Sequence, residues 1–315
     1  MENKRPLLSI CIPTYNGGEK LNYSLGSLIR AVKDRDDVEI IVSDNCSTDN
    51  TKEILADLSK KYNRIEIHRN EMNLGFNGNI KLIIDKYASG KYCWIIGDDD
   101  VIDINTFEGV INLLNNGYSF VCVNSGSIST NEIYFNKVNE PSRVEFKTAS
   151  FFKCLDLIAS QKNVLGTFMS SHIFLLDRIK EFDKSIFGNN DWKDYKNVFP
   201  NSYMMTNTFY KDENCCCIIT PIVYAMKHDK SWDDKISTIF MKILPDYYYY
   251  CYSLDEGRGN LKRNCMIIES SMVDQTISDI KSLRFKELKY DMFLKYIFYK
   301  RVFEKIQSKF VRRKS

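Results

Sequence analysis

The alternation of strand-like and helix-like segments over the first 125 residues is the feature that most constrains the fold. Short apolar runs typical of buried strands, such as Leu7–Pro13 and Val38–Asp44, are separated by stretches with apolar residues three or four positions apart. The first of these helix-like stretches carries Leu21, Leu25, Leu28, Ile29 and Val32. Because a helix between two strands carries the chain back, the strands of such a series run parallel. The sequence therefore predicts an α/β fold, with a mixed but mainly parallel sheet and helices on both faces.

The regular alternation stops near Ser125, and this change divides the chain into three regions. Residues 126–235 mix short apolar segments with polar loops. Residues 236–315 are rich in aromatic side chains, many of them at the spacing of a helix face. We therefore expect regions 1–125 and 126–235 to be followed by a helical C-terminal region, 236–315.

The last part of the chain is strongly basic. Residues 281–315 hold twelve Lys and Arg against three Asp and Glu, so they carry +9 while the whole chain carries only +3. A basic aromatic segment can lie on an anionic membrane surface, or its apolar stripe can pack on the protein or on a second subunit. Both alternatives stay open, and with them the oligomeric state. The basic charge is local and no nucleic-acid-binding motif accompanies it, so we expect no nucleic-acid partner.

The ten cysteines indicate a reduced protein. Cys11, Cys93 and Cys122 lie in apolar, strand-like runs, where cysteine acts as a small hydrophobic residue. Cys215–Cys217 are consecutive, and no paired C-x-x-C spacing indicates a zinc site. The first residues lack the apolar core of a signal peptide, and no apolar run approaches the ~18 residues of a membrane span. We expect a cytoplasmic protein, with the inner face of the cytoplasmic membrane as an alternative location.

Three consecutive aspartates, Asp98–Asp100, follow directly after the predicted buried strand Tyr92–Ile96. Adjacent carboxylates repel one another, so a sequence selected for stability alone would avoid them. Open α/β sheets bind their ligands at the carboxyl ends of strands, where these aspartates are expected. Mg²⁺ and Mn²⁺ favour carboxylates together with phosphate oxygens. The triplet therefore predicts a metal site, and its alternative is a solvated acidic turn.

Three further polar turns follow predicted strands. "PTYNGG" begins at Pro13, "SDNCSTDNT" places Asp44 at a strand end, and "NLGFNGN" offers Asn73, Gly75 and Asn79. Their glycines allow close backbone approach, and their side chains supply hydrogen bonds to a ligand. Each turn also has a plain structural explanation, as a loop or as the N-cap of the next helix.

Taken in order, these four motifs resemble those of family 2 glycosyltransferases with the Rossmann-like GT-A fold. The likeness is carried by "SICIPTYNGGEKLNYSLGSL", "IIVSDNCSTDNT", "NLGFNGN" and "YCWIIGDDDVI". It is greatest to the bacterial surface-polysaccharide branch, which includes abequosyltransferase-like sequences. It covers residues 7 to about 115 strongly and extends loosely to about 235. The resemblance implies that 1–125 is the nucleotide-sugar-binding half of a GT-A domain and that 126–235 is its acceptor-binding half.

The resemblance also implies roles for individual residues. A donor site would be formed by Pro13, Thr14, Tyr15, Asn16, Asp44, Asn45, Asn73, Gly75, Asn79, Asp98 and Lys227. Within it, Asp44 would recognise the base. The metal would be held by Asp99 as principal ligand, by Asp100, and by His228 from a later loop. Asn45 and Cys46 stand where the family usually has an acid and a glycine, which leaves the identity of the base open.

In the implied mechanism, an acceptor hydroxyl attacks the anomeric carbon with inversion while the nucleoside diphosphate leaves. A carboxylate must accept the hydroxyl proton, and the best match for this general base is Asp191, with Asp194 as the alternative. A solvated loop acid remains the other interpretation of each. Ser170 and Ser171 precede a probable strand, and we expect them beside the sugar or the acceptor.

The sequence thus predicts an inverting, metal-dependent glycosyltransferase. It would use Mn²⁺ or Mg²⁺ and move a sugar from a nucleotide-sugar, with a UDP-sugar as first expectation. The acceptor would be a saccharide or a lipid-linked saccharide in bacterial surface glycan synthesis, such as that of lipopolysaccharide or capsule. The alternatives are a sugar nucleotidyltransferase and a non-catalytic nucleotide- or glycan-binding scaffold.

Overall fold

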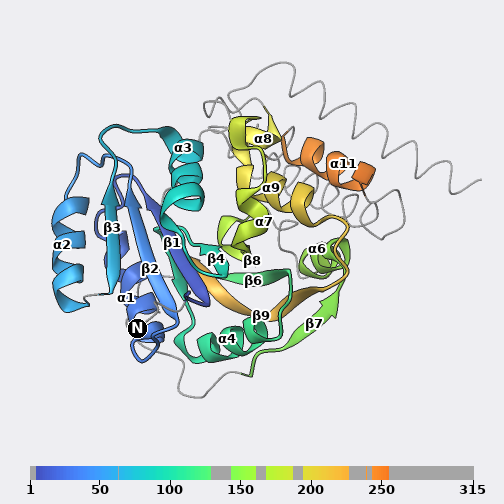
Figure 1. Ribbon diagram of the computed structural model, residues 1–315, viewed down its shortest axis with the longest axis horizontal. Helices are drawn as coiled ribbons and strands as arrows, with labels where there is room; N and C mark the ends of the chain where they lie inside the picture. The colour runs from blue at the N-terminus through green and yellow to red at the C-terminus, as the bar shows by residue number, and fades with distance from the viewer. Residues whose placement is uncertain are drawn as a thin grey trace, which may run out of the picture. The chain divides into compact units, whose positions relative to one another are not determined.

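The computed structural model describes residues 5–62, 64–128, 143–160, 168–186, 194–226, 239 and 243–254 (Figure 1). The chain separates into two compact units. One unit contains Met1–Asp191 and Lys196–His228, and the other contains Trp192–Tyr195 and Asp229–Ser315. The sheet lies in the first unit.

The first half of the sheet is parallel, as the sequence predicts. Its strands are β1 (Leu8–Thr14), β2 (Val38–Asp44), β3 (Ile65–Arg69) and β4 (Tyr92–Ile95), in the spatial order β3-β2-β1-β4. The chain steps from β1 outward to β2 and β3, then returns to place β4 on the other side of β1. This reversal is a topological switch point, and ligands of open α/β sheets bind beside it at the carboxyl edge of the strands.

The connections place helices on both faces of this half-sheet. Helices α1 (Lys20–Val32) and α2 (Thr51–Lys61) lie in the outward steps, while α3 (Gly75–Leu82) and the π-helix η1 (Ile83–Tyr87) lie in the return step. Right-handed crossovers in opposite directions leave their helices on opposite faces. Figure 1 shows α3 on one side of the strands and α1 on the other.

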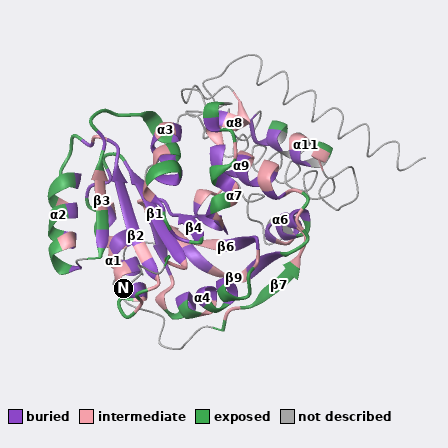
Figure 2. Cartoon of the chain, in the orientation of Figure 1, coloured by how far each residue is buried: buried purple, intermediate pink, exposed green. Residues whose placement is uncertain are grey.

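Burial explains why α1 forms where it does. Its residues Leu21, Leu25, Leu28 and Val32 recur at helical spacing, and all four are fully buried against the sheet. Figure 2 shows β1, β2 and β4 as almost continuously buried, whereas β3 at the edge carries intermediate and exposed residues. Helix α3 begins at Gly75, so five of the seven residues of the predicted polar turn "NLGFNGN" are helical.

The second half of the sheet is mixed. Strand β8 (His172–Leu175) runs antiparallel between β4 and β6 (Phe120–Ile128), and β9 (Cys215–Met226) is parallel to β6. A short strand β5 (Asp100–Ile102) and β7 (Phe146–Ala149) both pair antiparallel with β9. The predicted boundary at residue 125 falls inside β6, whose pairing with β9 joins both predicted halves in one sheet.

Short helices make up the remaining described elements of the two units. In the first unit they are η2 (Ile104–Thr106), α4 (Phe107–Asn115), α6 (Phe151–Ser160), η3 (Met169–Ser171), α7 (Leu176–Lys180), η4 (Lys184–Ile186) and α9 (Pro200–Phe209), and α8 (Tyr195–Val198) begins in the second unit. Helix α4 confirms a predicted helix. The second unit contains α11 (Leu244–Leu254), the predicted aromatic helix, and there the ring of Tyr195 stacks on Tyr250 at 5.3 Å. The basic segment 281–315 lies outside the described residues.

The described cysteines are free thiols, as expected. Cys11, Cys93 and Cys122 are buried in strands, and so is the run Cys215–Cys217, where burial raises the pKa of each thiol to about 12. These side chains therefore act as small apolar residues. Within the described part of the chain, no helix is long and apolar enough to span a bilayer.

Candidate functional site

The acid loop, Gly97–Asp100, leaves the carboxyl end of β4 at the switch point. It closes on itself, because the Asp100 N–H donates to the Gly97 carbonyl at 3.1 Å. Asp100 is only 3% exposed, whereas Asp98 and Asp99 are half-buried. The Thr14 hydroxyl, at the end of β1, donates to Asp98 Oδ2 at 2.6 Å. The structure thus joins the first predicted motif to the aspartate triplet.

Two glycines make this close arrangement sterically feasible. A Cβ atom on Gly17 would lie 2.3 Å from Thr14 Oγ1 and 2.8 Å from Asp98 Oδ2. One on Gly97 would lie 2.9 Å from Asp99 Oδ1 and 2.7 Å from Asp100 Oδ2. Only glycine leaves these spaces open, so the carboxylates can fold back over the loop.

The chemistry of this loop fits a hard divalent cation. Carboxylate oxygens of Asp99 and Asp100 converge on the space that a Gly97 side chain would fill. Mg²⁺ and Mn²⁺ are bound through one or two carboxylates, with substrate phosphates and waters completing the shell. In the residues that the structure describes, no three His, Cys, Asp or Glu side chains form a complete metal-binding group.

The turns after β1 and β2 are tied together by hydrogen bonds. The Asn45 N–H donates to the Thr14 carbonyl at 2.9 Å, and the Asn16 N–H donates to Ser47 Oγ at 2.9 Å. In return, Asn16 Oδ1 accepts from the Thr48 N–H at 2.8 Å. Because β1 and β2 run parallel, their carboxyl ends lie at one edge of the sheet, and these hydrogen bonds join the two turns there. Tyr15, in the first of these turns, is exposed.

Asn16 and Cys46 both adopt left-handed backbone conformations, with φ of 55° and 66°. Asparagine tolerates this region, but a cysteine side chain is strained there. Cys46 occupies the position at which the resembling family usually has glycine, and the observed backbone gives the physical reason for that preference.

Asp44 is almost inaccessible in this structure. Its side chain is 2% exposed, pairs with the guanidinium of Arg69, and accepts the Ser47 N–H at 2.9 Å. Arg69 also donates to the Ser47 carbonyl at 2.8 Å. Sequence reasoning missed Arg69, although it ends β3 in register with Asp44 at the end of β2. An acid and an arginine ending neighbouring strands is the signal that could have found it.

The third turn is held by an amide network. Asn45 Nδ2 donates to Asn73 Oδ1 at 2.8 Å and to the Gly75 carbonyl at 3.2 Å, while Asn45 Oδ1 accepts the Leu74 N–H at 2.9 Å. Asn79 is 2% exposed, and its amide exchanges hydrogen bonds with Ser43. These residues fix the shape of the turns at the carboxyl edge. That they contact a nucleotide directly stays a prediction.

The residues expected to act as general base, or to reach the donor and the metal from a later loop, are only partly described. Asp191, Lys227 and His228 lie outside the described residues, and Asp194 belongs to the second unit. Strand β9 nevertheless ends at the acid loop, because the Met226 N–H donates to the Asp99 carbonyl at 3.2 Å.

A sequence model of glycosyl transferase family 2 matches residues 9–178, which is more than half of the chain. The chain belongs to this family. Among curated relatives, the abequosyltransferase RfbV of Salmonella typhimurium is 43% identical over 97 residues, 30% of this chain and 29% of RfbV. The GalNAc(5)-diNAcBac-PP-undecaprenol beta-1,3-glucosyltransferase of Campylobacter jejuni is 34% identical over 117 residues, 37% of each protein. The chain thus spans about a third of the length of these relatives.

Solved structures confirm the GT-A fold of this family 2 member. Residues 1–349 of Staphylococcus aureus TarS, in complex with UDP-GlcNAc, superpose with a TM-score of 0.55 at 14% identity, covering 80% of this chain and 74% of that TarS chain. The mannosyltransferase PcManGT of Pyrobaculum calidifontis, in complex with GDP-Man and Mn²⁺, gives 0.51 at 13% identity, covering 87% of this chain and 76% of PcManGT.

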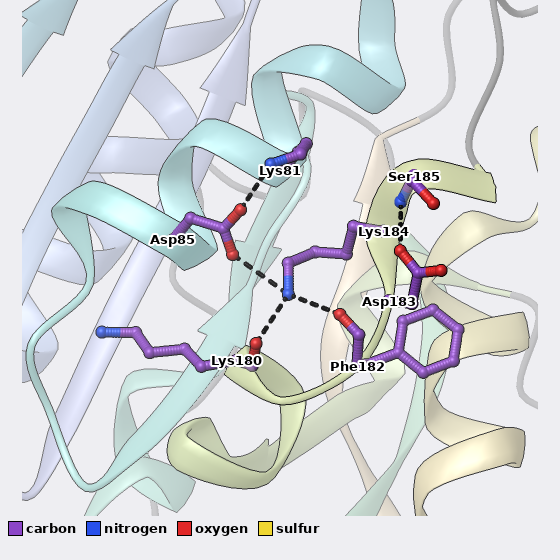
Figure 3. Close-up of a pocket in the computed structure, with 7 residues that line it drawn as sticks. All are labelled: Lys81, Asp85, Lys180, Phe182, Asp183, Lys184 and Ser185. Atoms are coloured by element: carbon purple, nitrogen blue, oxygen red, sulfur yellow. Dashed lines mark hydrogen bonds and ion pairs between the residues drawn. The ribbon is translucent and has the colours of Figure 1, made fainter.

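A separate pocket of about 450 Å³ lies away from the acid loop of this family 2 glycosyltransferase (Figure 3). It is lined by Lys81, Asp85, Lys180, Phe182, Asp183, Lys184 and Ser185. Helix α7 beside it follows Leu175, which pairs with Tyr92 at the amino end of β4, so the pocket lies toward the opposite edge of the sheet. The buried ammonium of Lys184 bonds to Asp85 at 3.0 Å and to the carbonyls of Ile179 and Phe182. This lysine is therefore committed to holding α7 against η1.

Proposed function

We propose that the chain is an inverting, metal-dependent glycosyltransferase that moves a sugar from a nucleotide-sugar to a saccharide or a lipid-linked saccharide. The observation that carries the proposal is the hydrogen bond between Thr14 and Asp98, which joins the turn after β1 to the acid loop at the switch point. Family membership and the GT-A fold support the same activity.

A UDP-sugar is the proposed donor. TarS, which shares the fold, was solved with UDP-GlcNAc and with UDP. Pro13, Thr14, Tyr15 and Asn16 would line the nucleotide, with Asn73, Gly75 and Asn79 shaping the next turn. Asp44 would recognise the base together with its neighbour Asn45, and this requires Arg69 to share or release the buried carboxylate.

Asp99 is the proposed principal metal ligand, supported by Asp98 and Asp100. A bound Mn²⁺ or Mg²⁺ would neutralise the diphosphate as it departs. PcManGT, solved with Mn²⁺, supports this choice of cofactor. Lys227 would add positive charge at the diphosphate and His228 would complete the metal site, since both follow Met226, whose N–H is bonded to Asp99.

The general base is proposed to be Asp191, with Asp194 as the alternative. Its carboxylate would accept the proton of the acceptor hydroxyl on the face opposite the leaving diphosphate. Inversion at the anomeric carbon follows from attack on that face.

A lipid-linked acceptor in bacterial surface glycan synthesis is proposed from the relatives. The Campylobacter enzyme named above and the diphosphoundecaprenol glucosyltransferase WfgD of Escherichia coli both carry such an acceptor in their names. The basic segment 281–315 would then bring the enzyme to the cytoplasmic face of the membrane, where such acceptors are available.

Isothermal titration of UDP with and without Mn²⁺ tests the proposal. Mn²⁺ should strengthen UDP binding to the wild-type protein, and D99A should lose this enhancement while keeping its fold by circular dichroism. S119A, which removes a buried hydroxyl remote from the acid loop, is the matched control. If Mn²⁺ has no effect on the wild-type protein, a non-catalytic scaffold becomes the better explanation. Hydrolysis assays over a panel of nucleotide-sugars then identify the donor.

A further inference from the structure

Hydrogen bonds with buried serine hydroxyl groups hold the acid loop and the residues next to it. On α1, the Ser24 hydroxyl donates to the Gly97 carbonyl at 3.4 Å, and Ser27 Oγ accepts the Ile102 N–H at 3.2 Å. From the other side, Ser170 Oγ accepts the Gly97 N–H at 2.9 Å. Serine hydroxyls therefore anchor Gly97, at the start of the loop, and Ile102, shortly after its end.

Among these serines, Ser170 also holds one of the carboxylates. Its hydroxyl donates to Asp100 Oδ2 at 2.5 Å while it accepts the Gly97 N–H. A hydroxyl has a single proton to donate, so this proton is committed to Asp100. A hydrogen bond from a neutral donor to a carboxylate in a buried site is stronger than one between neutral groups. Ser170 thus fixes the backbone and the third carboxylate of the loop together.

Ser170 is itself rigidly placed. It is fully buried in η3, directly before β8, and its carbonyl accepts the Trp94 indole N–H at 2.8 Å. Strand β8 pairs with β4, with Ile173 opposite Trp94. Ser170, although it comes late in the chain, is therefore fixed against β4, the strand that precedes the acid loop.

This geometry gives the three aspartates different surroundings. Asp100 is buried and turned toward Ser170, whereas Asp98 and Asp99 are half-buried at the carboxyl edge. Three adjacent carboxylates repel one another, and donors are needed to hold them in one arrangement. Thr14 supplies such a donor to Asp98, and Ser170 supplies one to Asp100.

We propose that Ser170 is a positioning residue for the metal site: by holding Asp100 and Gly97, it sets the arrangement in which Asp99, supported by Asp98 and Asp100, would hold one divalent cation. This inference rests on the proposed metal-dependent function. The Ser170 side chain is fully buried in this structure, and it bonds to Gly97 and Asp100 within the protein, so its place beside the sugar or the acceptor stays a prediction.

The test measures Mn²⁺ affinity directly, by titration calorimetry in the presence of UDP. S170A should weaken Mn²⁺ binding at least tenfold, and S170C, which keeps a weak donor of similar size, should fall between S170A and wild type. The matched control is S119A. Ser119 is also buried and donates to the Asn214 carbonyl at 3.0 Å, so S119A loses a comparable bond without touching the loop. Its Mn²⁺ affinity should stay within twofold of wild type.

A double-mutant comparison tests the route through Asp100. If Ser170 acts by holding this carboxylate, S170A/D100N should bind Mn²⁺ about as weakly as the weaker single variant. If the factors by which the two single substitutions weaken Mn²⁺ binding multiply in the double variant, the two residues contribute independently, and the proposal is overturned.

Hydrogen exchange of the metal-free proteins gives a readout that does not depend on activity. The Gly97 amide should exchange faster in S170A than in wild type and S119A, because it loses its acceptor. Unchanged exchange at Gly97, or equal Mn²⁺ affinity of S170A and wild type, would refute the role of Ser170. Absence of any Mn²⁺ effect on UDP binding in the wild-type protein would instead contradict the proposed function.

Discussion

Removal of Arg69 should destabilise the protein far more than removal of an ordinary surface charge. The carboxylate of Asp44 is 2% exposed and is held by Arg69 and by the Ser47 N–H. R69A leaves this charge buried with one of its two donors, and breaking a buried ion pair on one side costs about 3–5 kcal/mol. Because the Arg69 side chain is 39% exposed, water screens part of the pair, and we expect a loss of about 2–3 kcal/mol in the free energy of unfolding.

Urea unfolding measures this loss, and two further variants show its cause. R69A/D44N also removes the Asp44 charge that R69A leaves without its ion-pair partner. The double variant should therefore recover at least about 1 kcal/mol in the free energy of unfolding relative to R69A. K60A removes a lysine that is 75% exposed and paired with Asp57, and should leave the free energy of unfolding close to that of wild type. A loss below about 1 kcal/mol for R69A, or an equal loss in the double variant, would refute the argument that Arg69 compensates a buried charge.

Three further predictions concern the carboxyl edge. G17A should weaken Mn²⁺-dependent UDP binding at least tenfold, because its Cβ would clash with Thr14 and Asp98; calorimetry checks this, and wild-type affinity would contradict the geometry. C46G should raise the free energy of unfolding by up to about 1 kcal/mol in urea titrations, since glycine removes the strain of a left-handed cysteine; a destabilised variant would argue against that strain. D191N should lower kcat by a factor of about 10² or more while UDP binding is retained, as expected on removal of a general base. Wild-type turnover in D191N would contradict the assignment of Asp191 and favour Asp194 as the general base.

Local patterns in the sequence were sufficient to predict the first half of the fold. Strands β1, β2 and β4 are apolar runs with clear limits, and α1 has an apolar stripe at helical spacing. Because these strands run parallel, their carboxyl ends, and the polar turns that follow them, lie at one edge of the sheet. The place of the aspartate triplet therefore followed from the sequence.

The second half depends on pairings that local patterns do not encode. Strand β8, at residues 172–175, enters between β4 and β6, and the three-residue strand β5 finds its partner in β9. Periodicity identifies a strand but not its neighbour. For the same reason, the sequence did not reveal the contact of Ser170 with Asp100 or that of Arg69 with Asp44.

Short polar side chains also limit what the sequence can predict about the site. Asn45 and Asn79 look in the sequence like residues that could contact a ligand, but the structure buries both in an amide network between turns. A buried amide must find partners for its donors and acceptors, and the protein supplies them here. Sequence alone does not distinguish an asparagine that shapes a binding edge from one that touches the ligand.

The late arrival of β8 and β9 has a consequence for biosynthesis. The acid loop gains its contacts with Ser170 and with the end of β9 only after those residues have left the ribosome, although its own aspartates are made much earlier. A nascent chain that ends near residue 125 would expose β4 as an unpaired edge, the kind of surface at which strands from other chains associate. Premature termination should therefore yield an aggregation-prone fragment rather than a small nucleotide-binding module. We expect a complete acid-loop site only in chains whose synthesis has passed residue 226.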